Sequence, residues 1–175
     1  YLRVVASDIF QARGAATFVF NQLGFRRSAI LYHPGNPYSE GLALMFQEEF
    51  EDLGGQVIVS ATIESGETDM ESALAAVVSE SPDLVYLTIF PSEGAALVHQ
   101  ARQIPGLDRT VLMGSDSLWA QEFLAALGDV AEGMYLSASS FDAKQGAARV
   151  SLFGKYQAAD REGTLTQWHG HADDA

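Results

Sequence analysis

Short apolar runs alternate with amphipathic helical segments along most of this sequence. The clearest pair is residues 28–33 (SAILYH), an apolar run of strand length, and residues 39–53, where apolar side chains recur at spacings of four, four and three from Leu42 to Leu53. Strands that alternate with helices over short links form βαβ units, whose parallel sheet is covered by helices on both faces. The sequence therefore predicts an α/β fold.

The same periodicity predicts the remaining elements. Further strands are expected at residues 57–63, 84–90, 110–113 and 133–138, and further helices at about 69–80, 92–104, 117–128 and 145–160. Residues 3–5 suit another strand, and Ala12, Ala16, Val19 and Leu23 form one face of a helix. Thr68 and Glu71 have capping-box spacing, and Ser117 is expected to cap a helix. We expect a flavodoxin-like open parallel sheet of about five strands with helices on both faces.

Composition removes several classes of function. The chain has 175 residues, which favours one domain, and a formal charge of −13, which opposes the phosphate backbone of a nucleic acid. No apolar run approaches the roughly 18 residues of a membrane span. The absence of cysteine removes thiol catalysis and cysteine–zinc sites and fits any redox compartment.

The fold class predicts where a ligand would bind. In open parallel sheets, ligands bind outside the carboxyl ends of the strands, where the strand order reverses. The loops expected there carry two aromatic residues, three hydroxyls and one carboxylate: Tyr38, Phe90, Ser92, Ser115, Ser117 and Asp116. That set suits a small ligand with an apolar part and a cationic group. The alternative is that Asp116 and Ser117 cap a helix and that Tyr38 packs on a neighbour.

The sequence contains no recognisable catalytic motif. It has no dinucleotide-binding glycine motif, no P-loop, no nucleophile elbow, and no paired carboxylates at the strand ends. A small α/β hydrolase is therefore the weakest of the hypotheses. His169 and His171 have the spacing of a metal site, but a solvated tail or a connecting strand is favoured, so we expect neither metal nor cofactor. A backbone hydrogen bond is favoured for His33 over a ligand contact.

Six short motifs in order resemble a known family. They are residues 3–11 (RVVASDIFQ), 36–41 (NPYSEG), 54–69 (GGQV followed by GETD), 81–86 (SPDLVY), 129–134 (DVAEGM) and 171–175 (HADDA). Together they resemble type I periplasmic solute-binding proteins of the branched-chain amino-acid (Leu/Ile/Val) class, which deliver ligands to ABC transporters. Asp173 stands where that family usually has tyrosine, and Ser39 where it has glycine.

The resemblance implies a two-lobed, non-catalytic binding protein of which residues 1–175 are the second lobe. Residues 1–8 and 169–175 would be crossover segments to a missing first lobe. The implied partners are a small ligand such as an amino acid and the membrane permease of an ABC transporter. The implied location is periplasmic or extracellular. An isolated lobe would also expose a cleft face through which it could self-associate.

The resemblance also implies roles for individual residues. Tyr38 matches the family's ligand-contacting tyrosine, and Phe90 lies near an aromatic contact. Asp116 matches the acidic residue that accepts the ligand's α-amino group, as an ammonium in a partly buried cleft requires. A sensor or receptor with the same fold is the alternative function, and the sequence flanking this chain would discriminate between the two.

Overall fold

A computed structural model describes residues 7–138, of which residues 8–138 form one compact unit. Its elements in chain order are α1 (Asp8–Asn21), β1 (Arg27–Tyr32), α2 (Pro37–Asp52), β2 (Gln56–Thr62), α3 (Glu71–Glu80), β3 (Leu84–Thr88), α4 (Pro91–Ala101), β4 (Val111–Gly114), the 3₁₀ turn η1 (Asp116–Leu118), α5 (Gln121–Leu127), the 3₁₀ turn η2 (Gly128–Ala131) and β5 (Tyr135–Leu136). The predicted strand at 3–5 and helix at 145–160 lie outside the described residues.

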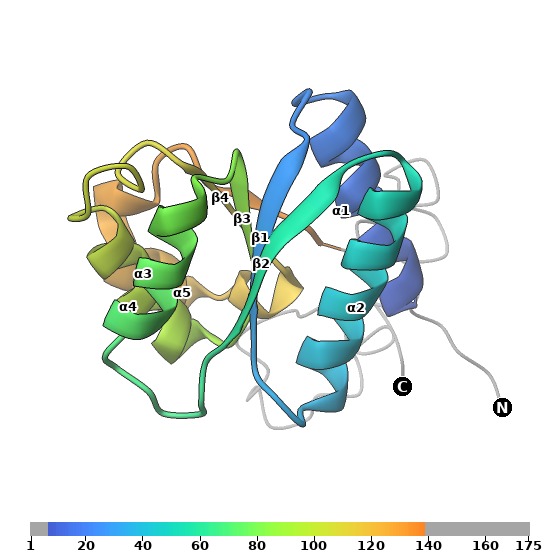
Figure 1. The fold of residues 1–175 in the computed structure, drawn as a ribbon. Helices are drawn as coiled ribbons and strands as arrows, with labels where there is room; N and C mark the ends of the chain where they lie inside the picture. Colours follow the sequence, from blue (N-terminus) through green and yellow to red (C-terminus); the bar gives the residue numbers. More distant parts are fainter. Residues whose placement is uncertain (1–6, 139–175) are drawn as a thin grey trace, which may run out of the picture. The chain divides into compact units, whose positions relative to one another are not determined.

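The five strands form one parallel sheet in the order β2-β1-β3-β4-β5 (Figure 1). This is the predicted flavodoxin-like order. The direction of strand addition reverses between β1 and β3, because β2 lies on one side of β1 while β3, β4 and β5 follow on the other. The carboxyl ends of β1 and β3 therefore flank the expected ligand crevice.

Helices cover both faces of the sheet, as the sequence predicts. Figure 1 shows α1 and α2 on one face and α3, α4 and α5 on the other. The strands supply both cores by alternation, since successive side chains point to opposite faces. On β3, Val85 and Leu87 enter the core under α3 and α4, whereas Leu84 and Tyr86 enter the core under α1 and α2.

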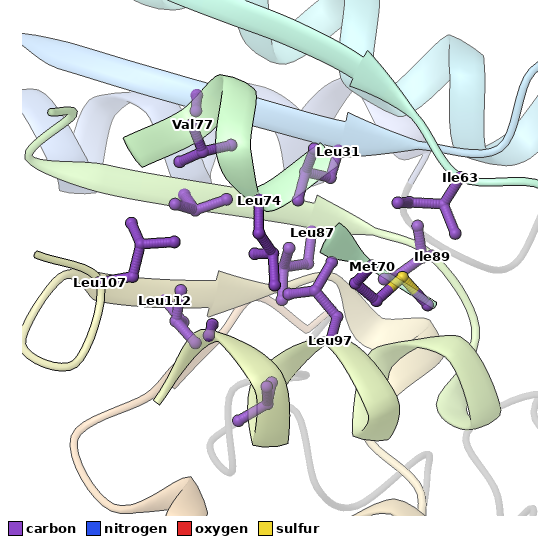
Figure 2. Packing of buried hydrophobic residues seen from close by; sticks show 14 of the residues in the cluster. Leu31, Ile63, Met70, Leu74, Val77, Leu87, Ile89, Leu97, Leu107 and Leu112 are labelled. Atoms are coloured by element: carbon purple, nitrogen blue, oxygen red, sulfur yellow. The ribbon is translucent and has the colours of Figure 1, made fainter. Parts of the chain in front are cut away.

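The core under α3, α4 and α5 is mostly aliphatic, with Phe123 as its buried aromatic residue. Figure 2 shows Leu31 and Leu87 from the sheet facing Leu74 of α3 and Leu97 of α4. All four side chains are buried. No helix among residues 7–138 is both long and apolar enough to cross a membrane.

Several predicted boundaries are wrong. β3 ends at Thr88 instead of residue 90, because Phe90 becomes the N-cap of α4, and α4 itself ends at Ala101. α1 stops at Asn21, so Leu23 lies beyond the helix. β5 has only two residues, since pairing with the short strand β4 ends after Leu136.

The predicted capping box of α3 is also wrong. Met70 occupies the N-cap position and no side chain caps the helix; the backbone N–H of Glu71 donates to Asp69 Oδ1 at 3.1 Å instead. Met70 is completely buried, and its N–H donates to Gln100 Oε1 at 3.0 Å. Burial of Met70 thus sets the start of the helix two residues later than Thr68 would.

The cap of α2 gives a contrasting prediction. Asn36 Oδ1 accepts the backbone N–H of Ser39 at 3.0 Å, so Asn36→Ala is expected to lower the free energy of unfolding by about 1 kcal/mol. Thr68→Ala removes a cap that the sequence predicts but the structure lacks. We expect it to change the free energy of unfolding by less than about 0.5 kcal/mol. Equilibrium urea denaturation measures both. Equal losses of unfolding free energy in the two variants would show that Thr68 does cap α3.

Candidate functional site

Three of the predicted site residues meet at the carboxyl edge of the sheet. Tyr38 lies in the first turn of α2 after β1, Phe90 follows β3, and Asp116 follows β4. The Tyr38 hydroxyl donates to Asp116 Oδ1. The Tyr38 and Phe90 rings stack with centroids 6.4 Å apart and planes 27° apart. The structure thus brings together an aromatic surface and a carboxylate that the sequence places 78 residues from Tyr38.

A glycine lets the Asp116 turn lie close to the sheet. Gly114 ends β4, and a Cβ there would come within 2.7 Å of side-chain carbons of Leu118 and Leu136. Real Cβ atoms do not approach this closely, so a larger residue would force the Leu118 and Leu136 side chains to move. Gly114 therefore leaves room for Leu118 of η1 to pack against the end of the sheet.

His33 extends the aromatic surface. Its ring stacks on Phe90 with centroids 5.2 Å apart, and its Nδ1 lies 2.6 Å from the carbonyl oxygen of Ile63. The expected backbone hydrogen bond of His33 is therefore confirmed. The Nε2 atom is buried and has no hydrogen-bond partner within residues 7–138.

The three predicted hydroxyls have different roles. Ser115 and Ser117 pair through their hydroxyl oxygens at 2.7 Å, and Ser117 donates to the carbonyl oxygen of Ile89 at 2.7 Å. These bonds tie the Asp116 turn to the end of β3. Ser92 is exposed and donates to the carboxylate of Glu93, so no contact places it with Asp116.

The alternative capping interpretation is wrong for Asp116 and Ser117. Neither η1 nor α5 has a side-chain cap, and Ser117 lies inside η1 instead of preceding a helix. The N-cap of α5 is Ala120. Tyr38 does pack on a neighbour, Phe90, but it also bonds to Asp116.

The electrostatics favour a phenol that stays protonated. Burial raises the pKa of the Tyr38 phenol, the hydrogen bond to Asp116 raises it further, and the hydroxyls of Ser115 and Ser117 offset this only in part. Tyr38 is therefore a hydrogen-bond donor at any physiological pH. A phenol held in this way donates its hydrogen bond to Asp116 throughout that range.

Two buried polar residues near this edge escaped the sequence analysis as site residues. Gln11 of α1 donates to Asp116 Oδ1 at 2.9 Å. Glu93 accepts the N–H of Gly66 at 2.6 Å. Burial raises the pKa of the Glu93 carboxyl, but hydrogen bonds from Ser92 and from the Gly66 backbone outweigh burial, so the pKa is lowered overall. The signal for Gln11 was its place beside Ala12 on the buried face of the first helix.

Metal binding finds no structural support in the described part of the chain. Residues 7–138 contain no group of three histidine, aspartate or glutamate side chains that could hold an ion. The histidines at 169 and 171, weighed as a metal site from the sequence, lie outside the described residues.

The sequence of the chain matches that of a known protein family. A family model described as "Periplasmic binding protein" matches residues 2–173 of the chain. The chain belongs to the periplasmic binding protein family. The predicted family is therefore confirmed.

Curated relatives are identical to this chain at more than a quarter of the aligned positions. A leucine-, isoleucine-, valine-, threonine- and alanine-binding protein of Pseudomonas aeruginosa is 29% identical over 132 residues, which are 75% of this chain and 35% of that protein. A Leu/Ile/Val-binding protein of Citrobacter freundii is 29% identical over 136 residues, 78% of this chain and 36% of that protein. The chain thus spans about a third of the length of these relatives.

A solved structure agrees with the fold. The crystal structure of a leucine-binding protein from Thermotoga maritima is 29% identical, with a TM-score of 0.72 over 88% of this chain and 45% of that one. These relatives are binding proteins by name, not enzymes.

Proposed function

We propose that this chain is one ligand-binding lobe of a two-lobed, non-catalytic periplasmic binding protein that takes up an amino acid or a similar small ligand. The observation that carries the proposal is the Asp116 carboxylate, held by Tyr38 beside the stacked Tyr38, Phe90 and His33 rings. A carboxylate next to an apolar wall matches the two ends of an amino acid with an aliphatic side chain.

The side chains at the carboxyl edge of the sheet favour an aliphatic amino acid as the ligand. An ammonium gains a charge-assisted hydrogen bond from a carboxylate, which is about twice as strong as a neutral one. The rings bury aliphatic carbon at roughly 25 cal/mol per Å². The names of the relatives, which bind leucine, isoleucine and valine, support the same class.

The share of each relative that the chain covers supports the proposed two-lobed arrangement. The chain matches about a third of its curated relatives and 45% of the leucine-binding structure. Residues 1–8 and 169–175 would connect to a first lobe that supplies the groups for the ligand's carboxylate. In that setting the lobes close on the ligand and present it to the permease of an ABC transporter, in the periplasm or outside the cell.

The test is calorimetric titration of the intact two-lobed protein with a panel of L-amino acids. We expect aliphatic amino acids to bind with dissociation constants at least about tenfold below those of acidic ones, because a second carboxylate would meet the charge of Asp116. An intact protein that binds none of the panel would contradict the proposed ligand class.

A further inference from the structure

Gln11 is the residue that links the Asp116 carboxylate to the rest of the sheet edge. Its side-chain nitrogen donates to Asp116 Oδ1 at 2.9 Å and lies 3.1 Å from the carbonyl oxygen and 3.2 Å from the hydroxyl oxygen of Ser137. Ser137 also contacts the Tyr86 hydroxyl at 3.3 Å and donates through its hydroxyl to the Gly114 carbonyl oxygen at 3.2 Å. Gln11 therefore joins α1, η1 and the residue after β5.

The two oxygens of Asp116 have unequal surroundings. Oδ1 accepts from both Gln11 and Tyr38, which are neutral donors. Oδ2 has no hydrogen-bond partner within residues 7–138. Gln11 is nine-tenths buried, whereas Asp116 and Tyr38 are partly exposed, so Gln11 holds the carboxylate from its buried side.

We infer that Gln11 is a positioning residue for ligand recognition: it fixes Asp116 so that Oδ2 remains open to the ammonium of a ligand. A carboxylate anchored through one oxygen loses little further freedom when the other accepts an ammonium, and this preorganisation lowers the cost of binding. Without Gln11, Tyr38 alone would hold Oδ1, and the carboxylate could rotate away from the ligand. The inference rests on the proposed function for its ligand, but not for the Gln11–Asp116 contact.

The contact itself is tested in the ligand-free protein. The two side-chain amide protons of Gln11 are observable by ¹H–¹⁵N NMR, and they should move when Asp116→Ala removes the acceptor. The side-chain amide of Gln100, which donates to the Thr68 carbonyl oxygen at 2.7 Å, should not move. Unshifted Gln11 resonances would overturn the inference whatever the ligand proves to be.

The role in recognition is tested by comparing two probes of one shape on the intact two-lobed protein. L-leucine carries the ammonium, and 4-methylpentanoate is the same molecule without it. Gln11→Met keeps the size of the side chain and removes the donor. It should weaken the binding of L-leucine about tenfold. The affinity for 4-methylpentanoate should change less than about twofold, because only the ammonium of L-leucine contacts Asp116.

Gln11→Lys provides the second variant, because it keeps a donor at this position if Gln11→Met does not fold. Its tethered ammonium would occupy Asp116 in place of the ligand's and should abolish the preference for L-leucine over 4-methylpentanoate. The matched control is Gln100→Met, which removes two hydrogen bonds of α4 and should leave the preference unchanged. If the Gln11 variants lose affinity equally for both probes, or lose none, Gln11 does not position Asp116. A wild-type protein that binds neither probe would contradict the proposed function while the NMR result still decides the contact.

Discussion

Asp116→Ala is expected to weaken the binding of an aliphatic amino acid by the intact protein at least about tenfold. The variant removes the carboxylate to which Tyr38, one of the two stacked rings, donates its hydroxyl hydrogen bond. It also leaves the Tyr38 hydroxyl and the Gln11 amide without their shared acceptor. Losing a charge-assisted hydrogen bond costs roughly 1.5–3 kcal/mol, and about 1.4 kcal/mol is tenfold in affinity.

The measurement is calorimetric titration of the wild type and the variant with L-leucine. Asp83→Ala is a matched control, because the Asp83 carboxylate accepts the backbone N–H groups of Arg26 and Arg27 at 2.9 Å each and has no part in the site. We expect this control to lower stability by about 1 kcal/mol and to bind like the wild type. Unchanged affinity in Asp116→Ala would remove this residue from the proposed site.

Phe46→Ala is expected to cost about 3–5 kcal/mol of unfolding free energy. Phe46 of α2 is completely buried and stacks on Tyr86 of β3, with centroids 4.4 Å apart. It also stacks on Phe50, with centroids 5.5 Å apart. Alanine would leave a cavity between α2 and the sheet, and neighbouring rigid rings cannot collapse to fill it.

Equilibrium denaturation with urea measures this loss. Leu44 lies on the same helix but is 59% exposed, so Leu44→Ala should change the free energy by less than about 0.5 kcal/mol. Because domains are stable by only about 5–15 kcal/mol, the Phe46 variant should lose a large share of its stability. A loss similar to that of Leu44→Ala would mean that α2 does not pack on β3 through Phe46.

The order of the sheet could be predicted because it depends on local patterns and general rules of chain connection. Apolar runs such as residues 84–88 are too short for buried helices, and right-handed βαβ crossovers leave few ways to arrange five strands. The start of α3 could not be predicted from Thr68 and Glu71, because burial of Met70 decided it. A core contact outweighed a local capping preference.

The sequence alone determined the α/β class, the parallel sheet, the edge at which a ligand would bind, and Asp116 with two aromatic residues at that edge. These depend on periodicity and on the geometry common to all parallel sheets. Only the tertiary structure decided that Asp116 bonds to Tyr38 and to Gln11, which is 105 residues away, and that Ser92 pairs with Glu93 instead. Hydrogen bonds between side chains depend on how whole elements pack in space, and no pattern along one chain records that packing.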